Sequence, residues 1–312
     1  MSELWYKGAP KIESKKSKSI IHPFVVRQHR GLTVNPYQGC QHRCAYCYAT
    51  YEWSPEFYDK IYAKSNAPEI LEMELAKWKP KTIQPVMISS ATDCYQPAEL
   101  RYALTGRCVK VLQKYKVPYY VFTKSAIIER DLELHRQYRS SCCIVWSITS
   151  CNEKIRRIIE PGTPPSDRIF SVIKRFADSG VRCAVNVDPI IPLISDTDDE
   201  LDAIINNCRA SGVTHVFGAI LRLRHDIWER MRNVLRLLEI PDAERTYKEI
   251  YNFEKPDSCY LAAGRAYETR ILDLLGMKVR RNGMLCRFPA GMVPKKIEKL
   301  DLGQTSITGY LA

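Results

Sequence analysis

Three cysteines on one short loop are the residues of this sequence best suited to chemistry. Cys40, Cys44 and Cys47 lie in the stretch NPYQGCQHRCAYCYA, with three and then two residues between them. Thiolates at this spacing can hold one face of a cubane iron–sulfur cluster, and they leave its fourth iron without a protein ligand. Because closed structural sites use four protein ligands, a three-cysteine loop indicates a site that binds a further molecule at the metal.

Zinc is the alternative metal for this loop. It would need a fourth ligand, and His42 lies inside the loop as the candidate. Zinc sites usually pair two short ligand clusters across a longer gap, and the sequence has no second CxxC. The spacing therefore favours the iron–sulfur cluster and leaves zinc as an alternative.

A scaffold of alternating strands and helices is predicted to position the loop. From residue 31 onward, short apolar runs rich in β-formers alternate with helical patterns, which is typical of a parallel α/β sheet. The expected strands are 32–37, 85–90, 118–123, 142–148, 181–187 and 213–220. The expected helices are 69–79, 97–115, 127–138, 167–179, 198–210 and 226–238.

Three regions are predicted along the 312 residues. Residues 1–30 form a basic N-terminal extension, residues 31–240 the core barrel, and residues 241–312 a C-terminal appendage. Helical patterns at 243–253 and 258–275 make the appendage mainly helical, and we expect it to cover the open side of the core. The length suits one large α/β domain with such additions.

Polar side chains follow several of the expected strands. Active sites of parallel barrels form where the carboxyl ends of the strands meet, so these side chains should share one rim with the cysteine loop. They are Ser89, Ser90, Thr92, Asp93, Cys94, Tyr95 and Gln96 after the second strand, Thr123, Lys124 and Ser125 after the third, Ser147 and Thr149 after the fourth, and Asn186 and Asp188 after the fifth.

The loop motif CxxxCxxC, with Tyr46 just before the third cysteine, resembles the signature of the radical S-adenosylmethionine (radical SAM) superfamily. The resemblance implies a partial (β/α)6 TIM-type barrel and a 4Fe-4S cluster whose open iron chelates S-adenosylmethionine. It also implies reductive cleavage of S-adenosylmethionine to a 5′-deoxyadenosyl radical, with electrons from a low-potential donor such as flavodoxin or ferredoxin.

Four further motifs resemble one subgroup, the spore photoproduct lyase-like or DNA repair photolyase-like proteins. They are TDxYQPxE, TKS, EPxTPxxxR and PIIPxxxD. The matching residues are Thr92, Asp93, Tyr95, Gln96, Pro97 and Glu99; Thr123, Lys124 and Ser125; Glu160, Pro161, Thr163, Pro164 and Arg168; and Pro189, Pro192 and Asp196. Lyase-like chemistry is what this resemblance implies.

The resemblance also suggests roles around S-adenosylmethionine. Lys124 would pair with the methionyl carboxylate and Ser147 would hydrogen-bond to it, while Ser89 and Ser90 would serve the methionyl amino group. Asn186 would bind the ribose, and Tyr46 would pack against the cluster or the adenine. Helix capping is the alternative role for these hydroxyls. Outside this set, Arg168 could clamp an anionic substrate or pair with Glu160, and we expect the pair. His42 could form a hydrogen bond beside the cluster, contact the substrate or be a solvated loop residue, and we expect the last.

Cys94 and Tyr95 are candidate catalytic residues for quenching a product radical. In spore photoproduct lyases, a cysteine just before the corresponding aspartate donates the hydrogen atom. Here Ser90, Ala91 and Thr92 precede Asp93, so the neighbouring Cys94 or Tyr95 would have to take that part. This departure weakens the expectation of a thymine-dimer lyase.

Charge and composition bound the partners and the cell compartment. The net charge is +12, and both ends of the chain are basic, which suits contact with a phosphate backbone. Twelve cysteines without an apolar signal segment favour a reducing cytoplasm, and the sequence has no apolar run long enough to span a membrane.

Two classes of function remain. The first is a radical SAM enzyme acting on nucleic acid by DNA repair or RNA modification, or else on a peptide or small molecule. The second is a non-catalytic, metal-stabilised module that binds nucleic acid. Convergent polar groups at the strand ends favour the enzyme, because a scaffold does not need them.

Overall fold

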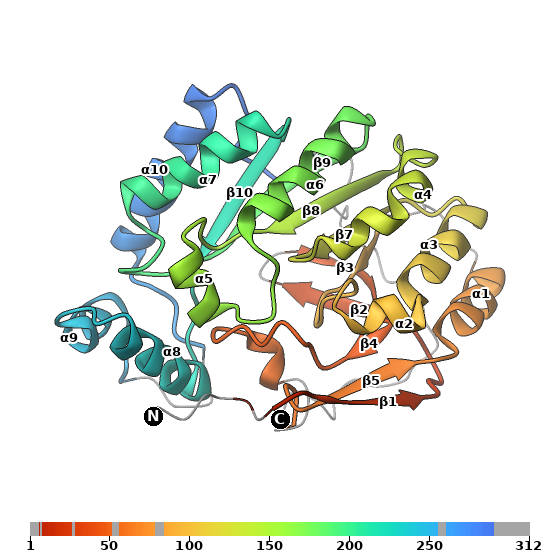
Figure 1. The fold of residues 1–312 in the computed structure, drawn as a ribbon, viewed down its shortest axis with the longest axis horizontal. Coiled ribbons are helices and arrows are strands. Elements are labelled where there is room, and N and C mark those ends of the chain that lie inside the picture. The colour runs from red at the N-terminus through yellow and green to blue at the C-terminus, as the bar shows by residue number, and fades with distance from the viewer. Residues whose placement is uncertain are drawn as a thin grey trace.

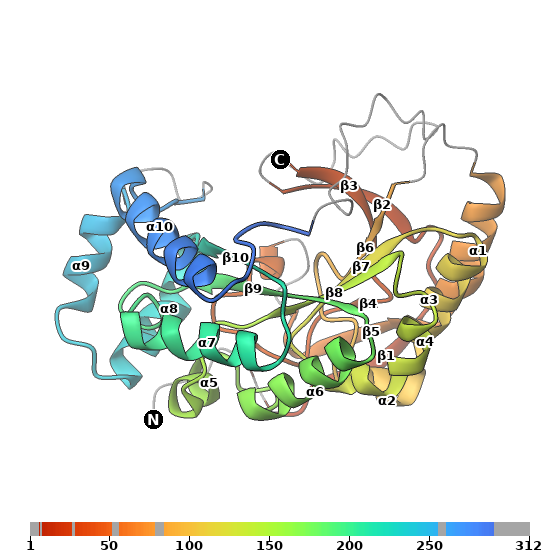
Figure 2. The same ribbon diagram turned by 90° about the horizontal axis from the view of Figure 1, so that it is seen from above.

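A seven-stranded sheet forms the centre of the computed structural model, which describes residues 6, 8–26, 29–51, 56–78, 84–254 and 260–289. Its strand order is β10-β9-β8-β7-β6-β3-β2, and Figure 1 shows its ribbon while Figure 2 labels all of its strands. Strands β3 to β10 in this sheet run parallel, and β2 pairs antiparallel with β3 at the edge. The strands are β2 Ile21–Val26, β3 His29–Val34, β6 Val86–Ile88, β7 Tyr119–Thr123, β8 Cys142–Ser147, β9 Arg182–Ile190 and β10 His215–Ile220. The predicted α/β class and its six parallel strands are confirmed.

Amphipathic helices cover one face of this sheet. Figure 2 shows α4 (Leu132–Arg136), α6 (Ser166–Asp178) and α7 (Asp198–Ala210) along the same side. In α6, Ile169, Ile173 and Phe176 are buried at helical spacing and share one core with Ile144 and Trp146 of β8. The other helices of the covering layer are α1 Ala67–Lys77, α2 Ala98–Tyr102, α3 Leu104–Lys114 and α5 Glu153–Ile159.

The chain after β10 forms the three remaining α-helices of the described residues. They are α8 His225–Leu237, α9 Ala243–Ile250 and α10 Arg265–Arg281, and the last two lie in the part that the sequence analysis predicts to be mainly helical. Two short 3-10 helices, η1 Tyr48–Tyr51 and η2 Ile127–Asp131, complete the elements. Among the described helices, none combines the length and apolarity that crossing a membrane requires.

A small second sheet brackets the cysteine loop. It has the order β1-β5-β4, with β4 Tyr37–Gln38 just before the loop and β5 Lys60–Lys64 after it. Strand β1, Lys11–Lys15, pairs parallel with β5. The segment 11–26, expected only as a basic extension, therefore supplies a strand to each of the two sheets.

The helix predicted over 97–115 is broken into α2 and α3. Ala103 between them takes a left-handed conformation with φ 49°, which ends the first helix. The buried carboxylate of Glu99 then accepts hydrogen bonds from the backbone N–H groups of Thr105 and Gly106, both at 3.1–3.3 Å. These bonds satisfy the free donors at the start of α3 and make the break stable.

The opposite, concave face of the sheet carries an aromatic floor. We use this name for Tyr120, Phe122, Phe217 and Phe288. The ring of Phe288, from the segment after α10, lies 5.2 Å from the rings of Tyr120 and Phe217 and 6.3 Å from that of Phe122. Figure 2 shows this segment crossing the sheet on the side away from α6 and α7. The described C-terminal chain thus reaches over the open side of the barrel.

Candidate active site around the cysteine loop

The cysteine loop, residues 39–47, lies between β4 and η1. Cys40 and Cys44 are buried and Cys47 is half-buried, and the three are free thiols. Burial is the main cause that raises the pKa of Cys40 and Cys44, and the nearby Cys47 raises both further. Cys47 is near enough to raise the pKa of both other thiols, so the donor set fits one shared metal cluster that would hold all three as thiolates.

Hydrogen bonds fix the carbonyl groups of the loop. Tyr58 donates its hydroxyl to the Cys44 carbonyl at 2.6 Å. From helix α8, Arg230 donates to the carbonyls of Ala45 at 2.7 Å and Cys47 at 3.1 Å. Asp226, one turn earlier, holds the same guanidinium at 2.7 Å. The loop is thereby anchored before any cofactor binds.

His42 joins the loop to two other segments. Its Nε2 lies 3.1 Å from Asp93 Oδ2 and its Nδ1 2.9 Å from the Gly162 carbonyl, and only 2% of the side chain is exposed. Burial disfavours the charged form of each partner, but their attraction is stronger, so the pKa of His42 is raised and that of Asp93 lowered. The expectation of a solvated His42 was wrong, because burial here is created by residues distant in sequence.

The position of His42 also bears on zinc. Both of its ring nitrogens contact other groups, so neither is directed at the cysteines. Within the described part of the chain, no three His, Cys, Asp or Glu side chains are arranged to hold a single metal ion. The geometry therefore gives no support to a zinc site completed by His42.

Asp93 links the ends of two strands. Its carboxylate accepts hydrogen bonds from Thr123 Oγ1 at 2.8 Å, from the Lys124 N–H at 2.7 Å and from the Tyr95 N–H at 2.8 Å. Together with the contact to His42, these bonds lock the rim after β6 to the rim after β7. A charged carboxylate with so many donors is a stable buried anion.

Gly162 lets the chain after α5 approach the loop. Its N–H donates to the His42 carbonyl at 3.0 Å. A Cβ at this position would lie 2.1 Å from the Gln41 carbonyl oxygen and 2.7 Å from His42 Cα. Only glycine allows this close backbone approach.

A buried ionic network lies beside the third and fourth strand ends. Glu160 pairs with Lys124 and Arg156, each at 3.1 Å, and accepts a hydrogen bond from Tyr46. Burial raises the pKa of Glu160, but the two cations outweigh it and lower the pKa to about 2. Tyr46 also bonds to Thr149 at 3.0 Å. Arg168 pairs with Glu129 instead of Glu160, so that expected pair was wrong.

The structure brings three of the expected cofactor-binding residues together. Lys124 Nζ donates to the Ser147 carbonyl at 3.3 Å and lies 5.4 Å from the centre of the Tyr46 ring. It is only 13% exposed, so its charge is held at a defined position by Glu160. Tyr46 uses its hydroxyl in the ionic network and packs its ring under the ammonium group.

Ser90 and Asn186 lie at other strand ends of the same rim. Ser90 Oγ accepts hydrogen bonds from Thr33 at 2.9 Å and Asn35 at 3.1 Å. Asn186 donates to Asp188 at 3.2 Å and pairs in register with Ser147. Strand alternation puts Asn186 on the face of Ala184, whose core cluster includes Phe288. Asn186 therefore faces the concave side above the aromatic floor.

Cys94 and Tyr95 lie elsewhere. Both side chains are fully buried, and the Cys94 sulfur is 3.9 Å from the Phe122 carbonyl oxygen. The Tyr95 hydroxyl bonds to Asp131 at 3.0 Å and to His135 at 3.1 Å, on the helix side of the sheet. This placement does not support direct hydrogen-atom donation by either residue.

Sequence reasoning missed the supporting roles of His42, Asp93, Glu160 and Arg230. Asp93 and Glu160 stand inside motifs that the sequence analysis singled out, so their positions carried a signal. Arg230 follows Asp226 by one helical turn, which is a common spacing for surface ion pairs and gives no indication of contact with Ala45, 185 residues earlier.

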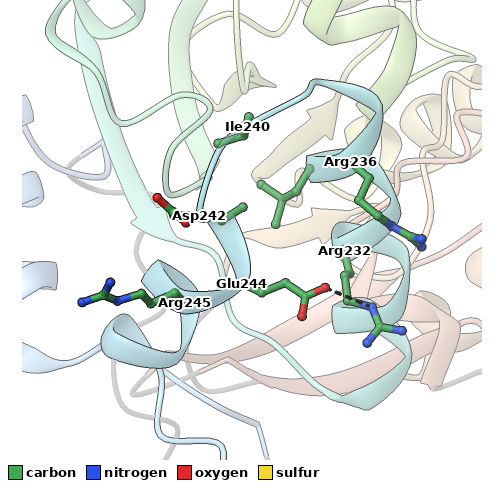
Figure 3. Close-up of a pocket in the computed structure, with 8 residues that line it drawn as sticks. Arg232, Arg236, Ile240, Asp242, Glu244 and Arg245 are labelled. Atoms are coloured by element: carbon green, nitrogen blue, oxygen red, sulfur yellow. Dashed lines mark ion pairs between the residues drawn. The ribbon is translucent and has the colours of Figure 1, made fainter.

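A separate hollow of about 300 Å³ lies between α8 and α9 (Figure 3). Its lining includes Arg232, Arg236 and Glu244, and Arg232 lies 3.9 Å from Glu244. These residues face away from the side of α8 that carries Asp226 and Arg230. The hollow is therefore a meeting point of two helices and is distinct from the cysteine-loop site.

Comparison with known proteins agrees with this geometry. The chain is 32% identical over 203 residues to an uncharacterised protein of Mycobacterium bovis, which covers 61% of this chain and 59% of the relative. An uncharacterised protein of Methanocaldococcus jannaschii is 27% identical over 187 residues, covering 59% of this chain and 69% of the relative. The chain thus spans about three fifths of the length of the mycobacterial relative.

Solved structures show the same fold. A spore photoproduct lyase variant with bound AdoMet and dinucleoside spore photoproduct superposes with a TM-score of 0.69, covering 91% of this chain and 87% of that chain at 11% identity. A radical SAM methyltransferase from Sphaerobacter thermophilus superposes with a TM-score of 0.53, covering 86% and 69% at 13% identity. Residues 34–208 match the radical SAM superfamily as a sequence family, which takes in the cysteine loop and most of the sheet. The chain therefore belongs to the radical SAM superfamily, whose members use a 4Fe-4S cluster and S-adenosylmethionine.

Proposed function

We propose that this protein is a radical SAM enzyme whose 4Fe-4S cluster is held by Cys40, Cys44 and Cys47. The anchored cysteine loop is the observation that carries the proposal: the carbonyls of Cys44, Ala45 and Cys47 and the side chain of His42 are held by hydrogen bonds, and the three thiols form no disulfide. When bound, the cluster supplies the electron that cleaves S-adenosylmethionine to a 5′-deoxyadenosyl radical, which abstracts hydrogen from the substrate. A flavodoxin or ferredoxin would serve as the low-potential electron donor.

Lys124 is proposed to bind the methionyl carboxylate of S-adenosylmethionine. An ammonium group has three donors, and Glu160 and the Ser147 carbonyl occupy two directions at most. Glu160 is also compensated by Arg156, so Lys124 can share its charge with a second carboxylate. The Ser147 hydroxyl would complete that contact.

The remaining positions of the rim are proposed to orient the rest of the cofactor. Ser90 would accept a hydrogen bond from the methionyl amino group in place of one of the two that it now accepts from Thr33 and Asn35. Asn186 would bind the ribose hydroxyls above the aromatic floor. Tyr46, fixed by Glu160 and Thr149, would limit access of water to the cluster side of the site.

A nucleic acid is the proposed substrate class. The net charge of +12 supports it, as do the spore photoproduct lyase structures that carry a dinucleoside photoproduct. A peptide or small molecule is the second candidate. The fully buried position of Cys94 favours a reaction other than that of the photoproduct lyases, whose cysteine donor has no counterpart before Asp93.

The proposal is tested by forming the cluster under anaerobic conditions and adding dithionite with S-adenosylmethionine. We expect 5′-deoxyadenosine from the wild type and none from Cys44→Ala. S-adenosylmethionine should also change the electron paramagnetic resonance spectrum of the reduced cluster. If the cluster is loaded, its spectrum does not change with S-adenosylmethionine and no 5′-deoxyadenosine forms, the result would favour the non-catalytic module instead.

A further inference from the structure

A buried lysine at the end of β5 has no counter-charge in the protein. Lys64 is only 7% exposed. Among the residues that the structure describes, no carboxylate pairs with its ammonium group, and no acceptor takes a hydrogen bond from it. A buried charge without a partner is costly, so such groups are normally paired or hydrogen-bonded. Lys64 is therefore a candidate for binding an anion from solution.

A second lysine lies beside it. Lys15 in β1 is exposed and pairs in register with Lys64, and its carbonyl accepts a hydrogen bond from the Ser65 N–H at 3.0 Å. We call Lys15 and Lys64 the lysine pair. Like charges opposite each other on neighbouring strands are destabilising. Burial and the charge of Lys15 together lower the pKa of Lys64 to about 8. An anion held by both ammonium groups would offset the burial and the repulsion.

The other titratable neighbours do not balance this charge. Burial raises the pKa of the Cys108 thiol in α3, so the thiol is uncharged near neutral pH. Burial, assisted by the charge of Lys64, lowers the pKa of His22 in β2, so its ring is neutral as well. Glu74 acts on His22, but its carboxylate already accepts hydrogen bonds from the Ser19 hydroxyl and from two backbone N–H groups. The charge of the lysine pair therefore has no compensation from these neighbours.

The N-terminus of α1 lies next to the lysine pair in the chain and adds to its positive charge. Figure 1 shows the end of β5 close to the start of α1. Asn66, which precedes α1, makes no capping bond with its side chain, because this side chain exchanges hydrogen bonds of 2.8 and 2.9 Å with the backbone of Ser17. Glu69, the acidic residue of the first turn, already pairs with Arg107. The partial positive charge of the helix end thus lies within a few residues of Lys64.

We propose that the lysine pair binds the dianion of a phosphate group, either inorganic phosphate or the terminal phosphate of a nucleotide or nucleic-acid strand. Such a group carries about −1.5 to −2 charges near pH 7 and three acceptor oxygens, which matches two ammonium groups. Tyr62 lies on the same face of β5. Its ring centre is 5.2 Å from Lys15 Nζ and 5.6 Å from Lys60 Nζ, and an aromatic ring beside a phosphate site suits an attached nucleoside.

The site goes beyond the proposed function, because it lies at the far end of β5 from the cysteine loop. Lys60, the first residue of β5, borders the loop: a Cβ on Gly39 would lie 2.4 Å from its carbonyl oxygen. Lys64 is four residues further on, which is about 13 Å along an extended strand. A phosphate held by the lysine pair would therefore be bound apart from the cluster.

The first test follows the reactivity of Lys64 in the cluster-loaded, full-length protein. Acetylation by an amine-reactive ester, quantified by peptide mass spectrometry, should slow severalfold at Lys64 when inorganic phosphate is added. Sodium chloride of equal ionic strength should have no such effect. Lys110, an exposed residue of α3, is the internal reference and should react at the same rate in both salts. Equal slowing at Lys64 and Lys110, or equal slowing by chloride, would overturn the proposal.

The second test uses variants. Lys64→Met keeps an unbranched apolar chain and removes the buried charge, so we expect it to unfold at the same temperature as the wild type or higher. Its affinity for inorganic phosphate should fall by about tenfold to a hundredfold, and that of Lys15→Met by about threefold to tenfold. Lys110→Met should bind phosphate like the wild type. Unchanged phosphate affinity in Lys64→Met would contradict the proposal, as would a lower unfolding temperature combined with no phosphate binding by the wild type.

Two oligonucleotides distinguish the sources of the phosphate. A short thymidine strand with a 5′-phosphate is compared with the same strand lacking it, each in competition with bound inorganic phosphate. Competition by the phosphorylated strand alone assigns the site to a terminal phosphate, and competition by neither assigns it to inorganic phosphate. Equal competition by both strands would show general charge attraction and overturn the site. None of these measurements involves S-adenosylmethionine, so their failure leaves the radical chemistry untouched, and a protein that forms no 5′-deoxyadenosine still tests the lysine pair.

Discussion

At the scale of single residues, His42 is the side chain that most directly sets the shape of the cysteine loop. It bridges Asp93 and the Gly162 carbonyl, and in sequence it lies between Cys40 and Cys44, two of the proposed cluster ligands. His42→Ala leaves a buried carboxylate with one partner fewer, so we expect a loss of about 2–3 kcal/mol in the free energy of unfolding. Retained iron and sulfide should fall in parallel, as measured after gel filtration without oxygen.

The matched control for this variant is the exposed His225→Ala, which should keep its metal content. His42→Gln can restore one of the two contacts, and an intermediate metal content is expected for it. Full cluster loading in His42→Ala would show that the loop is held well enough by Arg230 and Tyr58 alone.

A second residue, His135, makes stability depend on pH at a point remote from the cluster. It is fully buried, with hydrogen bonds of 3.1 Å to Tyr95 and Tyr119, and Asp131 faces it. Burial lowers its pKa from 6.5 to about 4, and the nearby Asp131 only partly opposes this. The unfolded chain therefore binds a proton between pH 6.5 and 4 that the folded chain does not bind.

Stability should therefore fall as pH drops from about 6.5 to about 4, by roughly 3 kcal/mol from this group. Thermal or urea unfolding across this range measures it. His135→Leu is expected to be less stable at neutral pH, because two tyrosine hydroxyls lose a partner, yet its stability should change less with pH. An unchanged pH dependence in this variant would assign the effect to other groups.

A functional residue could be identified from the sequence where its neighbours in the chain determine its role, and could not where distant segments do. The three cysteines are local, and their spacing alone predicts the cluster ligands. Lys124 and Ser147 were placed correctly on the rim because strand ends are readable from apolar patterns. The burial of His42 and the choice of Glu129 as the partner of Arg168 depend on packing between segments far apart in the chain, which no local pattern encodes.

At the scale of elements, the turn after α5 acts as a clamp on the cysteine loop. Gly162→Ala would force a methyl group to within 2.1 Å of the Gln41 carbonyl oxygen, which no small shift can relieve. We expect the turn to move away, the Gly162–His42 bonds to break and cluster loading to fall severalfold. Iron and sulfide per protein after anaerobic reconstitution report this.

Gly264→Ala provides the comparison, because its added methyl group would meet the Ile250 carbonyl oxygen at an ordinary 3.5 Å. It should load its cluster normally. Normal loading of Gly162→Ala as well would mean that the clamp is dispensable.

Element prediction succeeded where burial is strong and failed at the edges. The six parallel strands are apolar runs that are buried or half-buried, so their pattern could be found from the sequence. Strand β1, with the sequence KIESK, is mostly polar and exposed, and it is a strand because β5 offers it a free edge. The break at Ala103 similarly depends on Glu99 capping α3, a contact that the continuous helical pattern of 97–115 does not reveal.

At the scale of the whole molecule, the two faces of the sheet differ in what they carry: one packs against helices, and the other holds the rim residues and the aromatic floor. The helix-covered face holds the main core, including Trp146 and Phe176, and gives the barrel its rigidity. The concave face carries the rim residues and the aromatic floor, and the chain after α10 returns to cover part of it. The C-terminal part thus packs close to the site, because Phe288 contacts Phe217, and Phe217 pairs in register with Asn186.

Removing the returning ring should therefore affect both stability and cofactor binding. Phe288→Ala deletes a half-buried ring that contacts Tyr120, Phe122 and Phe217, and we expect a loss of about 1–3 kcal/mol in the free energy of unfolding. Because Phe217 lies beside Asn186, the affinity of the loaded protein for S-adenosylmethionine should fall severalfold, as measured by equilibrium dialysis. Leu285→Ala changes an exposed side chain of the same segment and should alter neither quantity. Phe288→Ala could instead be less stable and still bind S-adenosylmethionine as tightly as the wild type. The aromatic floor would then have a packing role only, and the segment that covers the barrel would not affect cofactor binding.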